Sequence, residues 1–208
     1  MKTVADLADE LWGQLRLAEL GAAVSILEEC KREKVPVRTR SRAGLPLIHF
    51  AAWNGRHAMD LAILMLMENG CDPNQLSKAA GWPATRHALV RGHNMALSAL
   101  LTGKIMVRVA HTPKRKKGAP PPKKRMVRIA LKKLPANIPL ANPNWQDQTG
   151  NTDLHLAVQL QNVEACKLLL ASGAKKDLAN MSGCTPAHLA MRSTPKIMKL
   201  FGIKIKTG

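Results

Sequence analysis

The 208-residue chain is long enough for one ordinary domain or a short array of repeats, and its apolar fraction of 46% is normal for a folded protein. Its charge is not normal, because 32 lysines and arginines against 14 aspartates and glutamates give a formal net charge of +18. Such an excess predicts a polyanionic partner, which would be nucleic acid, an acidic protein surface or an anionic membrane.

The excess of positive charge is confined to one part of the chain. No acidic residue lies between Asp72 and Asp147, and that interval carries fifteen lysines and arginines, twelve of them from Lys104 to Lys133. Seven of these twelve fall in the stretch KRKKGAPPPKKR at residues 114–125. We therefore expect one region of the protein to contact the anionic partner.

The cysteines predict neither a disulfide framework nor a zinc site, because they lie far apart without CxxC or cysteine–histidine pairs at ligand spacing. They are Cys30, Cys71, Cys166 and Cys184. This usage favours a reducing intracellular compartment, whether cytosol, nucleus or an organelle matrix such as that of the mitochondrion. We expect no cofactor, no metal and no small-molecule substrate.

No segment is typical of a membrane span or a secretory leader. The longest apolar run, LAILMLM at residues 61–67, is well below the roughly 20 residues that a membrane span needs. The first residues, MKTVADLADELWG, lack an apolar core, and Asp6, Asp9 and Glu10 argue against an acid-poor organellar presequence. Either the chain has no presequence or one was already removed from it.

The first part of the chain, residues 1–40, is predicted to form a small helical cap. The stretch LWGQLRLAELGAAVSILEECKRE contains two short helical patterns that break near Gly21. In residues 41–103, two segments open with related motifs, GLPLIHFAAWNG from Gly44 and GWPATRHALVRGH from Gly81. We expect each of them to open a degenerate helical repeat.

Residues 104–146 are predicted to be an insertion. The segment MVRVA at residues 106–110 is nearly repeated as MVRIA at residues 126–130. Both have a period of two, with β-branched residues at the second and fourth positions. This pattern predicts the two strands of a β-hairpin with KRKKGAPPPKKR at its tip. The next stretch, LKKLPANIPLANPNW, contains three prolines and is predicted to return as extended chain.

Residues 147–208 contain the clearest repeat. GNTDLHLA from Gly150 and GCTPAHLA from Gly183 recur at a spacing of 33 residues. Between them, VEACKLLLASGA has helical spacing and stops at Gly173, a residue type that ends helices without a steric penalty. The last repeat is predicted to be truncated, with a shortened second helix that starts near Pro195.

These motifs resemble the ankyrin repeat family, whose pattern is a turn, the motif T-P-L-H-x-A, a second helix with a leucine-rich run, and a glycine before an extended finger loop. The resemblance covers roughly 160 residues as four or five units. It implies an all-α repeat fold, the ankyrin solenoid, with an inserted β-hairpin that extends the finger region. It also implies that His49, His155 and His188 are structural, since this histidine commonly hydrogen-bonds backbone and orders the turn.

The candidate binding residues are the cations of the insertion, because a clustered basic loop binds phosphates through counterion release and tolerates loose geometry. These candidates are Arg108, Lys114, Arg115, Lys116, Lys117, Lys123, Lys124, Arg125, Arg128, Lys132 and Lys133. By resemblance, Trp53 and Arg91 occupy variable positions on the concave face and are candidates for a protein contact. The chain has no tyrosine and two phenylalanines, so it lacks a stacking platform for single-stranded nucleic acid.

The sequence favours no enzyme, because it has no phosphate-cradling glycine loop and no nucleophile in a recognisable elbow. It predicts an interaction or scaffold subunit of a large assembly, foremost a ribonucleoprotein such as a ribosome. The basic hairpin would contact rRNA phosphates there, and the helices would contact neighbouring proteins. One alternative is a structural subunit bound to an acidic protein assembly, such as a tubulin lattice or another multi-subunit complex. A second is a nuclear regulatory ankyrin protein whose basic stretch is an import signal or an inert loop.

Overall fold

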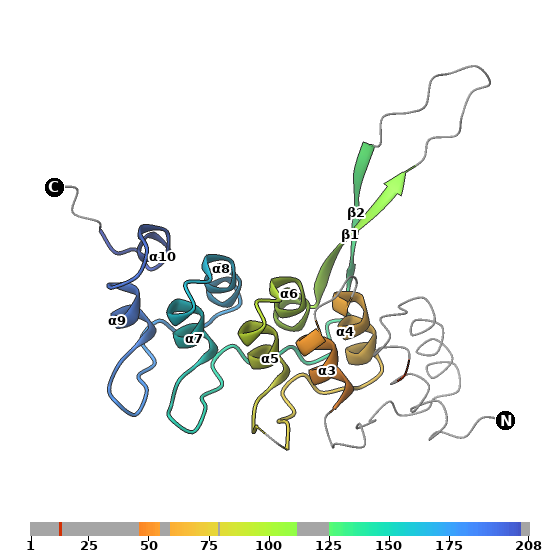
Figure 1. The fold of residues 1–208 in the computed structure, drawn as a ribbon. Helices are drawn as coiled ribbons and strands as arrows, with labels where there is room; N and C mark the ends of the chain where they lie inside the picture. Colours follow the sequence, from red (N-terminus) through yellow and green to blue (C-terminus); the bar gives the residue numbers. More distant parts are fainter. Residues whose placement is uncertain (1–12, 14–45, 55–58, 79, 112–124, 205–208) are drawn as a thin grey trace, which may run out of the picture.

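The computed structural model describes residues 13, 46–54, 59–78, 80–111 and 125–204, and for residues 106–111 and 125–133 it describes the backbone. The helices in these residues form four pairs, stacked side by side in two rows (Figure 1). We number the pairs as units 1 to 4. They are α3 Leu47–Asn54 with α4 Met59–Glu68, α5 Ala84–Val90 with α6 Asn94–Thr102, α7 Asp153–Gln159 with α8 Val163–Ala171, and α9 Pro186–Ala190 with α10 Pro195–Leu200.

This architecture confirms the predicted all-α repeat fold. The predicted cap at residues 1–40 lies outside the described residues. The described helices contain only five to ten residues each, and isolated helices of that length are marginal in water. Their stability therefore comes from packing between neighbouring units.

Packing between units follows the two rows. The first helices contact one another in the order α3, α5, α7 and α9, and the second helices in the order α4, α6, α8 and α10. Ala51, Ala88 and Ala157 are fully buried at equivalent places of successive first helices. Because alanine is small, these helices can approach closely, and the apolar side chains of both rows form one continuous core.

The histidine of the repeated motif joins unit 1 to unit 2 and unit 3 to unit 4. In unit 3, Thr152 and His155 form a capping box, in which the Thr152 amide donates to Nδ1 of His155. Since Nδ1 accepts this hydrogen bond, the neutral ring carries its proton on Nε2, which lies 3.0 Å from the carbonyl oxygen of Cys184 in unit 4. Nε2 of His49 lies 3.0 Å from the carbonyl oxygen of Trp82 in the same way. The motif therefore orders its own turn and the following finger loop together.

The insertion contains two strands, β1 Lys104–His111 and β2 Arg125–Lys133, which pair in antiparallel orientation. We call them the ribbon. Both strands are longer than the two five-residue strands predicted from the sequence, and residues 112–124, with most of the predicted tip, lie outside the described residues. The ribbon projects from the side of α4 and α6, away from the finger loops (Figure 1).

The side on which the ribbon projects differs from the sequence expectation, which placed it as an extension of the finger region. The physical reason is where the insertion begins. Gly103 ends α6 in the left-handed conformation with φ of 62°, and the next residue, Lys104, already begins β1, so the ribbon leaves at the end of α6 and not from a finger loop. After β2, the chain runs back and forms the finger loop of unit 3 separately, where Gly150 donates its amide to the carbonyl of Asp147.

The root of the ribbon is held against the array. Ile105 and Leu134 are only 3% and 5% exposed, and both belong to the continuous core. The Leu134 amide donates to the carbonyl of Gly103 at 3.0 Å, and the Ala141 amide donates to the carbonyl of Leu100 at 3.0 Å. The ribbon therefore leaves the array from a fixed, packed base.

We predict that Gly103→Ala destabilises the protein more than Gly92→Ala does. Both glycines have positive φ, of 62° and 71°, so each substitution costs about 1–2 kcal/mol in backbone strain. A Cβ at Gly103 would also lie 3.0 Å from Cδ2 of Leu140, and this crowding adds about 1 kcal/mol or more. A Cβ at Gly92 would meet nothing within 4 Å. Urea unfolding measures both losses, and equal losses would contradict a packed ribbon base.

Candidate functional site

The ribbon brings the predicted binding residues of the two strands into register. Arg108 lies opposite Arg128, and Lys133 lies opposite Lys104, a cation that the sequence analysis did not single out. Lys132 pairs with Ile105 and Arg125 with His111. The remaining candidates, Lys114, Arg115, Lys116, Lys117, Lys123 and Lys124, lie outside the described residues.

This register places like charges directly opposite one another twice. In an antiparallel pair, such an arrangement is destabilising by a few tenths of a kcal/mol to about 1 kcal/mol for each pair. No acidic residue occurs in either strand to offset it. The strands have eight and nine residues, so at about 3.3 Å per residue the ribbon is about 25 Å long. The ribbon is therefore an electrostatically unfavourable structure that a polyanion would stabilise.

Trp53 and Arg91, the two predicted protein-contact residues, lie together. The guanidinium carbon of Arg91 lies 4.7 Å from the centre of the Trp53 ring, in the geometry of a cation–π interaction. The Trp53 side chain is 39% exposed, and the neighbouring Val90 is 41% exposed. Leu160 at the end of α7 in the next unit is exposed as well. Aromatic and arginine side chains are enriched at protein interfaces.

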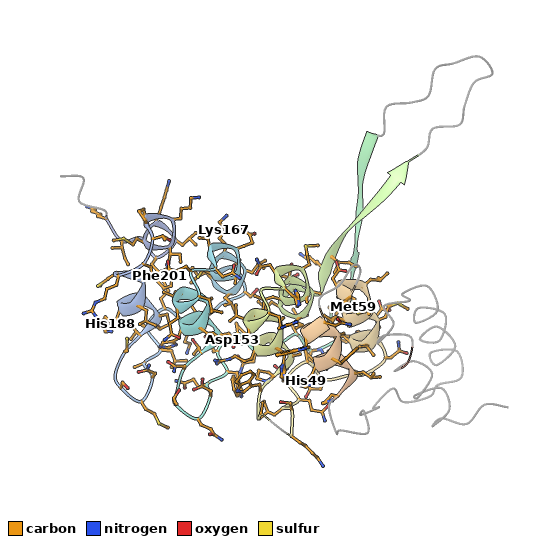
Figure 2. All side chains as sticks on the ribbon, in the orientation of Figure 1. His49, Met59, Asp153, Lys167, His188 and Phe201 are labelled. Carbon is orange, nitrogen blue, oxygen red and sulfur yellow. The ribbon has the colours of Figure 1, made fainter. Side chains whose placement is uncertain are left out.

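Two of the histidines predicted to be structural, His49 and His188, lie toward the two ends of the described array (Figure 2). His49 and His155 are fully buried, and burial lowers the pKa of His155. His188 is exposed and forms the same capping box with Thr185. A lowered pKa keeps the His155 ring neutral at neutral pH, as is required for Nδ1 to accept the hydrogen bond from the Thr152 amide.

The sequence analysis missed a buried ionic cluster that joins units 2 and 3 across the insertion. Arg86 is only 4% exposed, and its Nε lies 2.7 Å from Oδ1 of Asp153 on α7. Its two terminal nitrogens reach Oδ2 of Asp147 at 3.2 Å and the carbonyl of Asn151 at 2.9 Å. The guanidinium also lies 5.2 Å from the centre of the Trp145 ring. We call these residues the Arg86 cluster.

The two acids of the Arg86 cluster lie in different environments. Complete burial raises the pKa of Asp153, and the positive charge of Arg86 opposes that shift. Partial burial alone would raise the pKa of Asp147, but hydrogen bonds from Thr149 and Asn151 and the charge of Arg86 outweigh it and lower that pKa. Asp153 therefore depends on Arg86 as its charge partner, whereas Asp147 has hydrogen bonds of its own.

A signal for the Arg86 cluster was present in the sequence. Arg86 replaces the histidine of the T-P-L-H motif in unit 2, and Asp153 replaces the proline of the same motif in unit 3. Each substitution alone introduces a charge at a buried position, which is costly without a partner. Their occurrence in consecutive units indicates that the two charges compensate each other.

The described residues contain neither a metal-ligating cluster nor a membrane-spanning helix. No group of three or more histidines, cysteines, aspartates or glutamates is arranged there to hold a metal ion. Within the same part of the chain, every helix is too short or too polar to cross a bilayer. The candidate functional features of the described residues are therefore the ribbon, the Trp53–Arg91 pair and the Arg86 cluster.

Comparison with known proteins agrees with the stacked helix pairs. A family model described as ankyrin repeats (3 copies) matches residues 123–206. This match confirms the resemblance to ankyrin repeats over residues 123–206. A stretch of 55 residues is 38% identical to the human transient receptor potential cation channel subfamily A member 1, and 49 residues are 45% identical to neurogenic locus notch homolog protein 1 of Danio rerio.

These matches cover 26% and 24% of this chain, and they span only 5% and 2% of the two relatives. They therefore concern the repeats and not the whole of either relative. Ankyrin repeats indicate a scaffold for protein–protein interaction, and the stacked units present extended surfaces suited to that purpose.

We predict that Arg86→Ala destabilises the protein by about 3–5 kcal/mol, because it leaves the buried Asp153 without its charge partner. The double variant Arg86→Met with Asp153→Leu removes both charges and should recover most of that loss. Lys167→Ala, which breaks an exposed ion pair with Glu164, should cost under about 1 kcal/mol.

Urea unfolding of the three variants and the wild type provides the measurement. If Arg86→Ala costs no more than Lys167→Ala, the Arg86 cluster does not hold units 2 and 3 together. If the double variant is as unstable as Arg86→Ala, the loss comes from packing and not from the unpaired charge.

Proposed function

We propose that this protein is a non-enzymatic interaction subunit of a ribonucleoprotein, such as a ribosome. In this proposal the ribbon binds the phosphates of structured RNA, and the ankyrin units contact neighbouring proteins. The observation that carries it is the ribbon itself, which holds lysines and arginines of both strands in register on a packed base away from the finger loops.

The charge of the ribbon supports a phosphate partner. Twelve lysines and arginines lie from Lys104 to Lys133 with no acid among them, so the region repels itself unless an anion neutralises it. Phosphate contacts require only cationic donors, and the release of condensed counterions supplies affinity that does not depend on base sequence. Arginine also matches phosphate oxygens with two parallel hydrogen bonds.

The composition of the ribbon supports RNA with secondary structure over a single strand. Neither strand contains a phenylalanine, tyrosine or tryptophan, and single-stranded binders rely on such residues for base stacking. Double-stranded RNA is recognised mainly by shape and through its phosphates and 2′-hydroxyls. A cationic ribbon of about 25 Å suits contacts of that kind.

The protein-facing role rests on the exposed side chains of the first helices. Trp53, Val90 and Leu160 are exposed at the ends of α3, α5 and α7, and Arg91 stacks on Trp53. They lie in three consecutive units, so a partner could contact several units at once. The main rival to RNA is an acidic protein assembly, whose carboxylates would meet the same cations.

We predict that the purified protein binds an RNA hairpin with a long duplex stem and that the affinity falls steeply with salt. Over about 50 to 200 mM salt, the logarithm of the affinity should fall with a slope of about 0.7–0.9 for each phosphate neutralised. Replacing residues 111–125 by a short Asn-Gly turn should reduce the slope by several units. Fluorescence anisotropy with a labelled hairpin measures both quantities.

The control for this experiment is Lys167→Ala together with Lys175→Ala, which removes two exposed cations of unit 3 and should leave the slope unchanged. Weak RNA binding with a shallow slope would overturn the proposal and favour an acidic protein partner. An equal loss in the control variant would mean that the whole basic surface binds RNA without a defined site.

A further inference from the structure

The pairing of the two ribbon strands contains an irregularity. The pairs from His111–Arg125 to Val107–Ile129 form a regular antiparallel ladder, in which each step moves one residue along both strands. Between Ile105 and Val107 the register shifts, so that Met106 of β1 faces two residues of β2, Ala130 and Leu131. This arrangement is a β-bulge with one extra residue in β2.

The bulge changes which lysine of β2 lies opposite Lys104. A regular ladder continued from the Arg108–Arg128 pair would place Lys132 opposite Lys104, four residues further along both strands. With the extra residue in β2, Lys133 takes that place, and Lys132 lies opposite Ile105 instead. Because residues directly opposite one another share a face of the ribbon, the bulge exchanges the faces of these two adjacent lysines.

One face of the ribbon therefore collects four cations. Successive residues of a strand alternate between faces, so Lys104 and Arg108 share a face, and register adds Lys133 and Arg128 to it. We call this set the cationic face. The opposite face holds β-branched residues in facing pairs, Val107 with Ile129 and Val109 with Val127. Lys132 and the His111–Arg125 pair also lie on this second face, which we call the apolar face after its two central pairs.

The root of the ribbon fixes which face points toward the array. Ile105, on the apolar face, is 3% exposed and belongs to the core, whereas its neighbour Lys104 is exposed. The apolar face is thus the one that continues into the array, and the cationic face begins in solvent.

Resting on the proposed function, we propose that the cationic face is the surface that binds the RNA phosphate backbone and that the bulge assigns Lys133, and not Lys132, to it. The two like-charged pairs stand four residues apart, or about 13 Å, along the ribbon. They repel within each pair, and a chain of regularly repeated phosphates relieves both pairs at once.

The matched lysines Lys132 and Lys133 test the assignment in the full-length protein. With a labelled RNA hairpin and a salt series as the probe, Lys133→Ser should reduce the salt slope by about 0.9, the amount expected for one lost phosphate contact. Lys132→Ser removes the same charge from the adjacent position and should reduce the slope by less than a third of that amount.

Two variants that add a lysine test the same assignment if Lys132→Ser or Lys133→Ser folds poorly. Ala110 lies on the cationic face and Val109 on the apolar face. Ala110→Lys should increase the slope by about 0.9, whereas Val109→Lys should leave it near the wild-type value. Circular dichroism and urea unfolding confirm that the compared variants remain folded.

Each outcome separates the face assignment from the proposed function. A steep wild-type slope with equal effects of Lys132→Ser and Lys133→Ser, or of the two lysine additions, overturns the assignment and leaves RNA binding intact. Negligible binding of the wild type to the hairpin, with retained binding to polyglutamate, overturns both and identifies an acidic protein partner.

Discussion

The guanidinium of Arg86 is buried between units 2 and 3, where Asp153 and Asp147 meet it across the point at which the insertion interrupts the stack. A repeat array is stabilised by contacts between nearest neighbours, so a long insertion between two units threatens the continuity of the core. The Arg86 cluster supplies a short, charged contact at that junction, and Asn94 and Asn162 exchange side-chain hydrogen bonds across it as well. The array can therefore carry the ribbon without dividing into two bodies.

The base of the ribbon is held in place at the same junction. Gly103 directs the chain out of α6, Ile105 and Leu134 enter the core, and Asn74 of the preceding finger loop donates to the carbonyl of Leu140 and accepts from the Asn142 amide. Beyond this base, the ribbon consists of two paired strands that carry opposed cations. In this account, the helical units hold the ribbon in a fixed position, and the cations of the ribbon supply the affinity for RNA phosphates. The contact does not depend on base sequence, but its place on the protein is defined.

The parts of the fold that were predictable from the sequence depend on local patterns. The T-P-L-H motifs and the period of two in MVRVA and MVRIA each lie within a few consecutive residues. The spacing of 33 residues follows from comparing two such motifs. The Arg86 cluster depends on residues more than sixty positions apart, which meet only after the units stack. The projection of the ribbon depends on β1 beginning at Lys104, directly after α6, whereas the sequence pattern predicted a strand only from Met106.

The candidate site divides in the same way. The composition of residues 104–133 identified the cations of the insertion, and position within the repeat identified Trp53 and Arg91. The faces of Lys132 and Lys133 could not be predicted from the sequence. Simple alternation along β2 would place Lys132 opposite Lys104, and only the extra residue of the bulge places Lys133 there instead. Register is a property of the paired strands, and the energy of pairing decides where the irregularity lies.

The most direct test of the account is hydrogen–deuterium exchange of the full-length protein with and without a duplex RNA hairpin. If the ribbon is the RNA-binding element, the amides of Lys104–His111 and Arg125–Lys133 should exchange more slowly in the complex, because neutralising the opposed cations stabilises their pairing. The amides of α7 to α10 should exchange at unchanged rates. Slower exchange confined to the ankyrin units, with the ribbon unaffected, would contradict the account.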